Sequence, residues 1–300
     1  MARNAELERT LADRPDDVDG YRVYADWLLD QGDTRGELIG RSLEYERTRD
    51  AKLGLMINGF IQRHVDELVG ELAPLLGYIR WRFGFFEEVK LDRALIREPF
   101  APVLERVLAH PSAALLRSLV FHAPDAAGLR PSFEVVARAQ PAALRSLKLG
   151  VDRGLGAIDE LFPLQLERFE LYVPEQYTAL DPITPAMLPS LARAPWRLRA
   201  LALHTGTSPA RLDDLVAVIT DPQLALVELR IAASHRDRAF ASTLVRELAG
   251  SATAQHLEKL ELDLDIGPAD HQWLVAQKAE RMPKLSKLDI PRGQFRRRPR

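Results

Sequence analysis

The sequence contains no cysteine among its 300 residues. This absence excludes disulfide bonds, thiolate metal sites and a cysteine nucleophile. Because secreted domains are often cross-linked by disulfides, it also favours a reducing compartment, and we expect a cytoplasmic protein. No apolar run approaches the roughly 18 residues that span a bilayer, and the first ten residues lack the apolar core of a signal peptide. We therefore expect no membrane partner.

A strong net charge is also missing. The chain has 41 basic and 43 acidic residues, which gives a formal net charge of -2. No global field therefore favours nucleic acid. The one basic concentration is the segment 291–300, which holds five arginines and two prolines. We expect this segment to be a disordered tail. This arginine-rich segment is the only feature of the sequence that suggests binding to nucleic acid or to an acidic partner. Because it is short, we do not expect nucleic acid to be the partner.

Catalytic and metal-binding motifs are absent as well. The sequence has no glycine-rich phosphate loop, no Gly-x-Ser-x-Gly elbow and no His-Glu-x-x-His. The histidines form no i, i+4 pair of the kind that binds metal; they are at positions 64, 110, 122, 204, 235, 256 and 271. We therefore expect no metal, no cofactor and no enzymatic activity. A hydrolase built from scattered Asp and His side chains is the alternative left open.

The sequence does contain a repeated pattern: an apolar residue, followed by apolar residues three and five positions later. Successive copies begin 22 to 32 residues apart, with a mean of about 28. A period of this size carrying L-x-x-L-x-L is typical of a leucine-rich repeat solenoid. The eight copies begin at Phe86, Leu116, Leu144, Leu166, Leu198, Leu226, Leu257 and Leu285.

We expect each repeat to form a strand, a loop, a helix and a second loop. Period-2 alternation at the end of each motif indicates the strand, and helical spacing followed by Pro or Gly indicates the returning helix. The predicted fold is α/β: a solenoid over residues 81–290 with a curved parallel sheet and helices on the convex side. The unit from Leu144 to Leu166 is the shortest. It leaves only residues 158–162 for a helix, so we expect one or two turns there.

Residues 1–80 lack the repeat and are predicted to be helical. Apolar spacing and N-cap residues indicate helices near residues 5–11, 21–29 and 36–49. A further apolar run over 53–76 is interrupted by Gly59, Gly70 and Pro74. Because a solenoid exposes the apolar face of its first repeat, we expect this region to act as a cap.

Part of the predicted cap resembles a known family. The segment RVYADWLLDQGDTRGELIGRSLE at 22–44 is similar to the bacterial repeat-companion domain, and WRFGFFEEVKL at 81–91 resembles the start of the first repeat in such proteins. The repeats themselves resemble the ribonuclease-inhibitor type, although no column of Asn or Cys follows the strands. The resemblance implies an architecture and no particular activity. The matching residues are Tyr24, Ala25, Asp26, Trp27, Leu28, Gly32, Asp33, Arg35, Gly36, Glu37 and Ile39.

Several motif residues are charged or aromatic, and we expect a structural role for them. Asp33 is predicted to cap the helix after Gly32, while Arg35 pairs with Asp26 or Glu37. Tyr24 and Trp27 are three positions apart, so they share a helix face and are predicted to pack in the core. A binding or catalytic site on the cap is the alternative for these six residues, Tyr24, Asp26, Trp27, Asp33, Arg35 and Glu37.

In a leucine-rich repeat sheet, residues between the core leucines point to the concave face. The middle strands then present a mixed patch, which we take as the candidate binding surface: His122, Lys148, Arg168, Glu170, Tyr172, His204 and Arg230. An ordinary solvated surface is the alternative interpretation.

The predicted function is therefore a non-enzymatic scaffold that binds a protein partner through this face. Two alternatives remain. One is self-assembly through the exposed terminal repeat, and the other is a regulator or effector acting with a separate catalytic partner. A repeat-linked ubiquitin ligase is excluded because its chemistry needs a cysteine.

Overall fold

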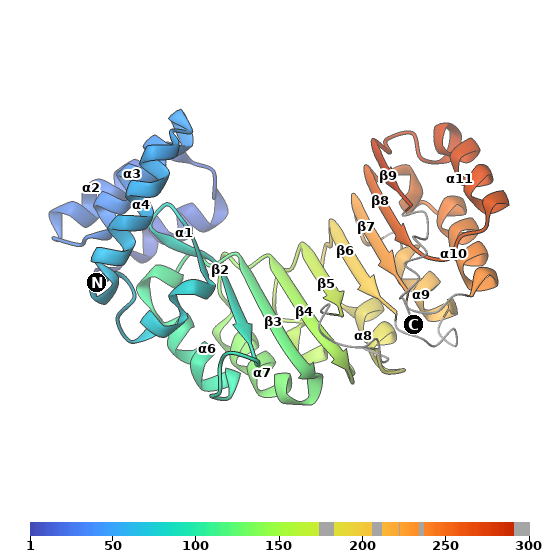
Figure 1. Cartoon of the computed structure of the whole chain (residues 1–300), viewed down its shortest axis with the longest axis horizontal. Helices are drawn as coiled ribbons and strands as arrows, with labels where there is room; N and C mark the ends of the chain where they lie inside the picture. Colours follow the sequence, from blue (N-terminus) through green and yellow to red (C-terminus); the bar gives the residue numbers. More distant parts are fainter. Residues whose placement is uncertain (174–182, 206–211, 222, 234–236, 291–300) are drawn as a thin grey trace, which may run out of the picture. The chain divides into compact units, whose positions relative to one another are not determined.

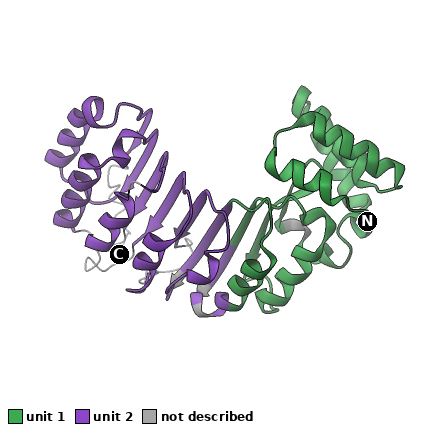
Figure 2. Ribbon diagram, turned by 180° about the vertical axis from the view of Figure 1, so that it is seen from behind, with its two compact units in different colours: residues 1–120, 131–145 green, residues 121–130, 146–300 purple. Residues whose placement is uncertain are grey.

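The computed structural model describes residues 1–173, 183–205, 212–221, 223–233 and 237–290; the predicted tail at 291–300 lies outside them. The fold is α/β. In the described residues, nine strands form one open sheet whose order, β1 to β9, follows the chain (Figure 1). Two compact units divide the chain (Figure 2). Unit 1 holds residues 1–120 and 131–145, and unit 2 holds residues 121–130 and the described residues from 146 onward.

The first 78 residues are helical, as the sequence predicts. Side-chain caps start three of the helices: Asn4 accepts from the amides of Glu6 and Leu7, Asp17 accepts from the amide of Gly20, and Asp50 accepts from the amide of Lys52. The predicted break at Gly59 is wrong, because this residue lies inside a continuous helix. The elements are α1 (Ala5–Asp13), α2 (Val18–Asp30), α3 (Arg35–Thr48), α4 (Ala51–Arg63), α5 (Val65–Leu68) and the 3-10 helix η1 (Gly70–Tyr78).

The sheet begins with a hairpin that the sequence analysis did not predict. Strands β1 (Ile79–Arg82) and β2 (Phe85–Asp92) are antiparallel, so the expectation of a wholly parallel sheet is wrong here, and a boundary at residue 81 cuts through β1. The two turn residues, Phe83 and Gly84, have φ of 46° and 74°. Two residues with positive φ give the tight turn that matches the twist of antiparallel strands. A Cβ at Gly84 would also lie 2.7 Å from the Ile39 side chain.

The remaining chain alternates between strands and helices. From β4 to β9, each strand pairs in parallel with the next. The shortest predicted unit contains a single 3-10 turn, η4, which confirms the expected loss of a full helix. The elements are α6 (Phe100–Ala109), η2 (Pro111–Ala113), β3 (Ser118–Asp125), η3 (Ala126–Leu129), α7 (Arg130–Ala139), β4 (Ser146–Arg153), η4 (Asp159–Leu161), β5 (Arg168–Tyr172), α8 (Met187–Arg193), β6 (Ala200–His204), α9 (Leu212–Ile219), β7 (Glu228–Ala232), α10 (Arg238–Gly250), η5 (Thr253–Gln255), β8 (Lys259–Asp263), α11 (Pro268–Arg281) and β9 (Lys287–Asp289). No helix in the described part of the chain is both long and apolar enough to cross a membrane.

The core of unit 2 lies between one face of the sheet and its helices (Figure 2). Burial alternates along β5, where Phe169 and Leu171 are buried and their neighbours are half-exposed. Strand register aligns equivalent apolar side chains in two rows, and fully burying each one stabilises the fold by about 1.5–3 kcal/mol. The rows are Leu147, Phe169, Leu201, Leu229, Leu260 and Leu288, and Leu149, Leu171, Leu203, Ile231 and Leu262.

Candidate functional site

The face of the unit 2 sheet opposite the helices, here called the open face, carries the polar residues of β4 to β9. Side chains alternate along a strand, so the residues between the buried leucines all point to this face. Register places them in two further rows. One row is Ser146, Arg168, Ala200, Glu228, Lys259 and Lys287, and the other is Lys148, Glu170, Ala202, Arg230, Glu261 and Asp289.

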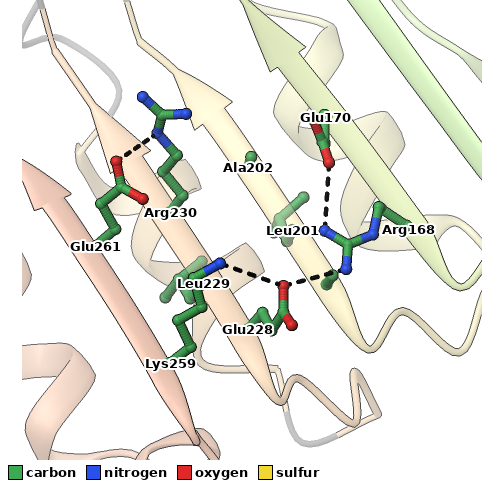
Figure 3. Close-up of a pocket in the computed structure, with 10 residues that line it drawn as sticks. Arg168, Glu170, Leu201, Ala202, Glu228, Leu229, Arg230, Lys259 and Glu261 are labelled. Atoms are coloured by element: carbon green, nitrogen blue, oxygen red, sulfur yellow. Dashed lines mark hydrogen bonds and ion pairs between the residues drawn. The ribbon is translucent and has the colours of Figure 1, made fainter. Parts of the chain in front are cut away.

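Arg168 is the centre of an ion-pair network on the open face (Figure 3). Its Nη1 lies 3.3 Å from Oε1 of Glu170 on the same strand, and its Nη2 lies 3.1 Å from Oε2 of Glu228. Glu228 is on β7, two strands away, and Ala200 on β6 lies between the two residues. The pair can form because the Ala200 side chain is small enough for Arg168 to extend over it. Ala200 is consequently only 5% exposed.

The network continues to the neighbouring strands with alternating sign. Nζ of Lys148 lies 4.0 Å from Glu170, and Nζ of Lys259 lies 3.9 Å from Glu228. Arg230 forms a separate pair with Glu261 at 3.0 Å. The side chains in these pairs are 24–57% exposed. Exposed pairs contribute about 0–1 kcal/mol each, so the network orders the side chains more than it stabilises the fold.

A hollow of about 130 Å³ lies within this charged region. Ala200 and Ala202 leave the space, and Arg168, Glu228 and Glu261 are among the charged residues around it. Small-molecule sites usually measure about 300–1,000 Å³. The hollow is therefore of a size for a single side chain of a partner rather than for a free ligand.

A second contact also crosses a strand. The Nε2 of His122 on β3 hydrogen-bonds the hydroxyl of Tyr172 on β5, and the two rings meet edge to face with centroids 5.4 Å apart. Strand β4 lies between them, and its residue opposite Tyr172 is Gly150. Because Gly150 has no side chain, the two rings can meet above it. The Tyr172 and Arg168 contacts therefore both depend on a small residue on the strand between the two partners.

His204 ends strand β6, opposite Ala232. Burial lowers the pKa of its imidazole, Asp263 opposes this effect, and Arg230 adds to it. The imidazole of His204 is therefore influenced by one charge on the neighbouring strand β7 and by one charge on β8, the strand beyond it.

The structure brings most of the predicted binding residues together. Lys148, Arg168 and Glu170 are in one network, Arg230 lines the same hollow, and His122 contacts Tyr172. The predicted set omitted important neighbours, which are Ala200, Ala202, Glu228, Lys259 and Glu261. Each occupies the same strand position as a predicted residue, so the alternation in the sequence already places all five on this face, and the predicted set included only part of each row.

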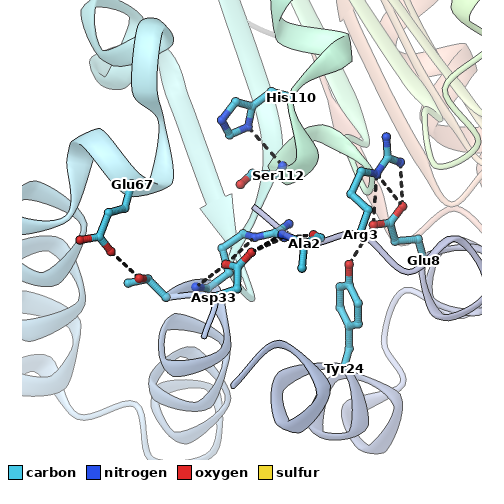
Figure 4. Close-up of polar contacts among 10 residues, drawn as sticks. Ala2, Arg3, Glu8, Tyr24, Asp33, Glu67, His110 and Ser112 are labelled. Atoms are coloured by element: carbon cyan, nitrogen blue, oxygen red, sulfur yellow. Dashed lines mark hydrogen bonds and ion pairs between the residues drawn. The ribbon is translucent and has the colours of Figure 1, made fainter. Parts of the chain in front are cut away.

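In the cap motif, Arg35 forms a buried ion pair with Asp33, which is labelled in Figure 4. Its Nη2 and Nε lie 2.9 and 3.1 Å from the two Asp33 oxygens, and its guanidinium also donates to the carbonyl of Ala2. The side chains of Arg35 and Asp33 are 0% and 5% exposed. The prediction that Arg35 pairs with Asp26 or Glu37 is therefore wrong. Arg35 begins α3, and its side chain turns back to the residue two positions earlier.

Asp33 accepts further hydrogen bonds from backbone amides. The amide of Arg35 donates to Oδ1 at 3.0 Å, and the amide of Ala2 donates to Oδ2 at 2.7 Å. The N-cap of α3 is Thr34, so the prediction that Asp33 caps this helix is wrong, although Asp33 lies one residue earlier and accepts from the first amide of the helix. Burial raises the pKa of Asp33, but the hydrogen bonds and charge of Arg35 outweigh this effect, so its pKa lies below the ordinary value.

Tyr24 belongs to a second buried contact in unit 1. Its hydroxyl donates to Oε1 of Glu8 at 2.8 Å, and Glu8 forms an ion pair with Arg3 at 2.7 Å (Figure 4). Burial and the Glu8 bond raise the pKa of Tyr24. The Tyr24 and Trp27 rings stack with centroids 5.7 Å apart; Tyr24 is buried and Trp27 is half-buried against the same core. These positions agree with the expected packing role.

Asp26 and Glu37, the remaining two motif residues, are exposed and lie outside both buried clusters. Glu37 pairs instead with Arg41, whose Nε lies 3.0 Å from its Oε1. In the residues that the structure describes, no group of three or more His, Asp and Glu side chains could hold a metal ion.

Comparison of this chain with protein-family profiles, with curated proteins and with solved structures found no match.

Proposed function

We propose that the chain is a leucine-rich repeat solenoid with a helical repeat-companion cap, and that it serves as a non-enzymatic scaffold for a protein partner. The two in-register apolar rows support the repeat, because the same motif positions oppose one another on successive strands. The proposed compartment is the cytoplasm, which fits a chain without cysteine.

The ordered charged surface around Ala200 and Ala202 carries the proposal. Acidic and basic side chains on β5, β7 and β8 surround a hollow over the alanines of β6, and this hollow suits one partner side chain. Alternating charges on neighbouring strands match a polar protein surface, and they offer no uniform basic stripe for nucleic acid. Arg168 and Tyr172 supply the side-chain types that dominate binding energy at protein interfaces.

Affinity capture with matched variants tests this function. The full chain and an Arg168→Ala/Tyr172→Ala variant are immobilised, and captured proteins are quantified by mass spectrometry. Arg246→Ala is the control, because Arg246 also forms an exposed ion pair, 3.0 Å from Asp270, but on the helices α10 and α11. We expect at least one protein retained by the wild type and the control to fall tenfold or more with the double variant. An unchanged set of captured proteins would contradict the proposal.

Self-assembly through the terminal strand is less well supported. Strand β9 has only three residues, and two of them, Lys287 and Asp289, are charged and exposed. Short, charged edge strands resist pairing with other chains. A regulator acting with a separate catalytic partner would use the same open face, and the capture experiment would identify that partner directly.

A further inference from the structure

A second surface lies in unit 1, in a groove between α2 and α3, which pack against each other (Figure 1). Its volume is about 420 Å³, within the range of ordinary ligand sites. The floor is apolar or small and the rim is charged. The floor consists of Ala25, Leu29, Gly36, Gly40 and Leu43, and the rim of Arg22, Asp26, Glu37 and Arg41.

Two glycines on α3 line this groove, and their surroundings differ. A Cβ at Gly36 would lie 2.7 Å from the carbonyl oxygen of Ala25, so this glycine allows α2 and α3 to approach. A Cβ at Gly40, one turn later, would have no atom within 4 Å. Internal packing therefore does not require Gly40, although glycine destabilises a helix relative to alanine. What Gly40 does provide is open space in the groove.

An exposed leucine adds apolar surface to this space. The Leu29 side chain is 53% exposed, although it belongs to the groove floor. Contiguous apolar surface with a charged rim, as in this groove, is typical of surfaces that bind another protein. Amphipathic helices commonly bind in such grooves through apolar residues spaced three and four apart.

The rim charges indicate which kind of helix fits. Arg22 pairs with Asp19 at 2.6 Å, and Arg41 pairs with Glu37, so both rim cations already have carboxylate partners. Asp26, in contrast, forms no ion pair or hydrogen bond through its carboxylate within the described residues. The rim therefore presents a negative charge that is available to a cation from outside.

We propose that the groove between α2 and α3 binds an amphipathic helix of a partner protein, with apolar side chains over Gly40 and Leu29 and a Lys or Arg at Asp26. This site is distinct from the open face and does not depend on its function. It also gives a role to Asp26, which the buried clusters of the cap motif leave exposed.

Two synthetic 16-residue helical peptides test the proposal. Both carry the same leucine stripe, and lysines flank the stripe in one peptide while glutamates flank it in the other. Fluorescence anisotropy of each labelled peptide is measured against the full chain. We expect saturable binding of the lysine peptide and weaker binding of the glutamate peptide. Asp26→Ala should lower the affinity for the lysine peptide about twofold to fivefold, as expected for the loss of an exposed ion pair. Asp26→Lys should reverse the preference.

Gly40→Leu fills the groove and should weaken binding of the lysine peptide at least tenfold. Its matched control is Gly59→Leu on α4, because a Cβ at Gly59 also meets no atom within 4 Å. Circular dichroism checks that both variants fold, and Arg168→Ala checks that the open face does not bind the peptide. The proposal is overturned by a lack of saturable binding to the wild type, by equal binding of the two peptides, or by unchanged affinity in Gly40→Leu.

Discussion

Arg168 on β5 and Glu228 on β7 form an ion pair of 3.1 Å although strand β6 lies between them. Two strand spacings separate their backbones by roughly 9.6 Å, so the pair requires a small residue on the intervening strand. Ala200 fills that position. His122 and Tyr172 meet across β4 in the same way. Small side chains on alternate strands thus determine which charged and aromatic groups of the open face touch.

A double-mutant cycle measures the dependence on Ala200. Arg168→Ala, Glu228→Ala and the double variant should give a coupling energy of about 0.2–1 kcal/mol, because the pair is partly exposed. In an Ala200→Leu background the larger side chain separates the pair, and the coupling should fall to about zero. Urea unfolding provides the free energies. Coupling that persists in the Ala200→Leu background would show that the pair does not extend over this position.

The buried pair in unit 1 should matter far more for stability. Arg35→Ala leaves the Asp33 carboxylate buried without its cation, and breaking such a pair costs about 3–5 kcal/mol. Arg35→Lys should be intermediate, because lysine cannot reproduce the two parallel bonds to Asp33. Arg22→Ala, which removes the exposed pair with Asp19, is the control and should cost less than about 1 kcal/mol. A similar free energy of unfolding for Arg35→Ala and Arg22→Ala would contradict this account.

Much of the secondary structure could be predicted because the apolar spacing is strong. The motif positions of β5 to β8 are the buried positions of the strands, and the short unit has only the turn η4 for a helix. The hairpin of β1 and β2 was missed because Phe83 is a buried aromatic residue at positive φ, where a turn residue such as Asn is usual. Its position depends on packing against Tyr21, whose ring centroid lies 4.7 Å away.

The sequence predicted which residues share the candidate site but not which of them form contacts. Alternation along each strand is enough to place Arg168 and Glu170 on one face. The partner Glu228 depends on the strand register and on the size of Ala200, which no local pattern gives. For Arg35, the sequence offered several carboxylates, and the turn geometry between α2 and α3 selects Asp33.

His110 should make stability depend on pH. Burial, with a contribution from the Arg35 charge, lowers its pKa from 6.5 to about 4. Between pH 6.5 and 4 the unfolded chain therefore binds a proton that the folded chain does not, so stability falls as the pH decreases. At about 1.4 kcal/mol per pH unit the full shift corresponds to about 3.5 kcal/mol, and solvent screening of this half-buried group brings the loss below that value.

The variant His110→Asn isolates this effect. The Nδ1 of His110 accepts from the amide of Ser112 at 3.2 Å, and an asparagine oxygen can accept the same bond. Urea unfolding from pH 7.5 to 4 gives the free energy of unfolding of both proteins. Below pH 6.5, the wild type should lose more of this free energy than the variant does. Parallel curves over this range would mean that His110 is protonated equally in the folded and unfolded states.

Two alanine substitutions on α3 should have opposite effects on stability. Gly36→Ala places a Cβ 2.7 Å from the backbone oxygen of Ala25, which cannot move without displacing α2, so we expect a loss of about 1–3 kcal/mol. Gly40→Ala meets no neighbour and should stabilise the protein by up to about 1 kcal/mol through helix propensity. Thermal and urea unfolding of the two variants measure the difference. Destabilisation by Gly40→Ala would mean that this glycine has a packing role inside unit 1, and it would remove the reason to regard its open space as a binding feature.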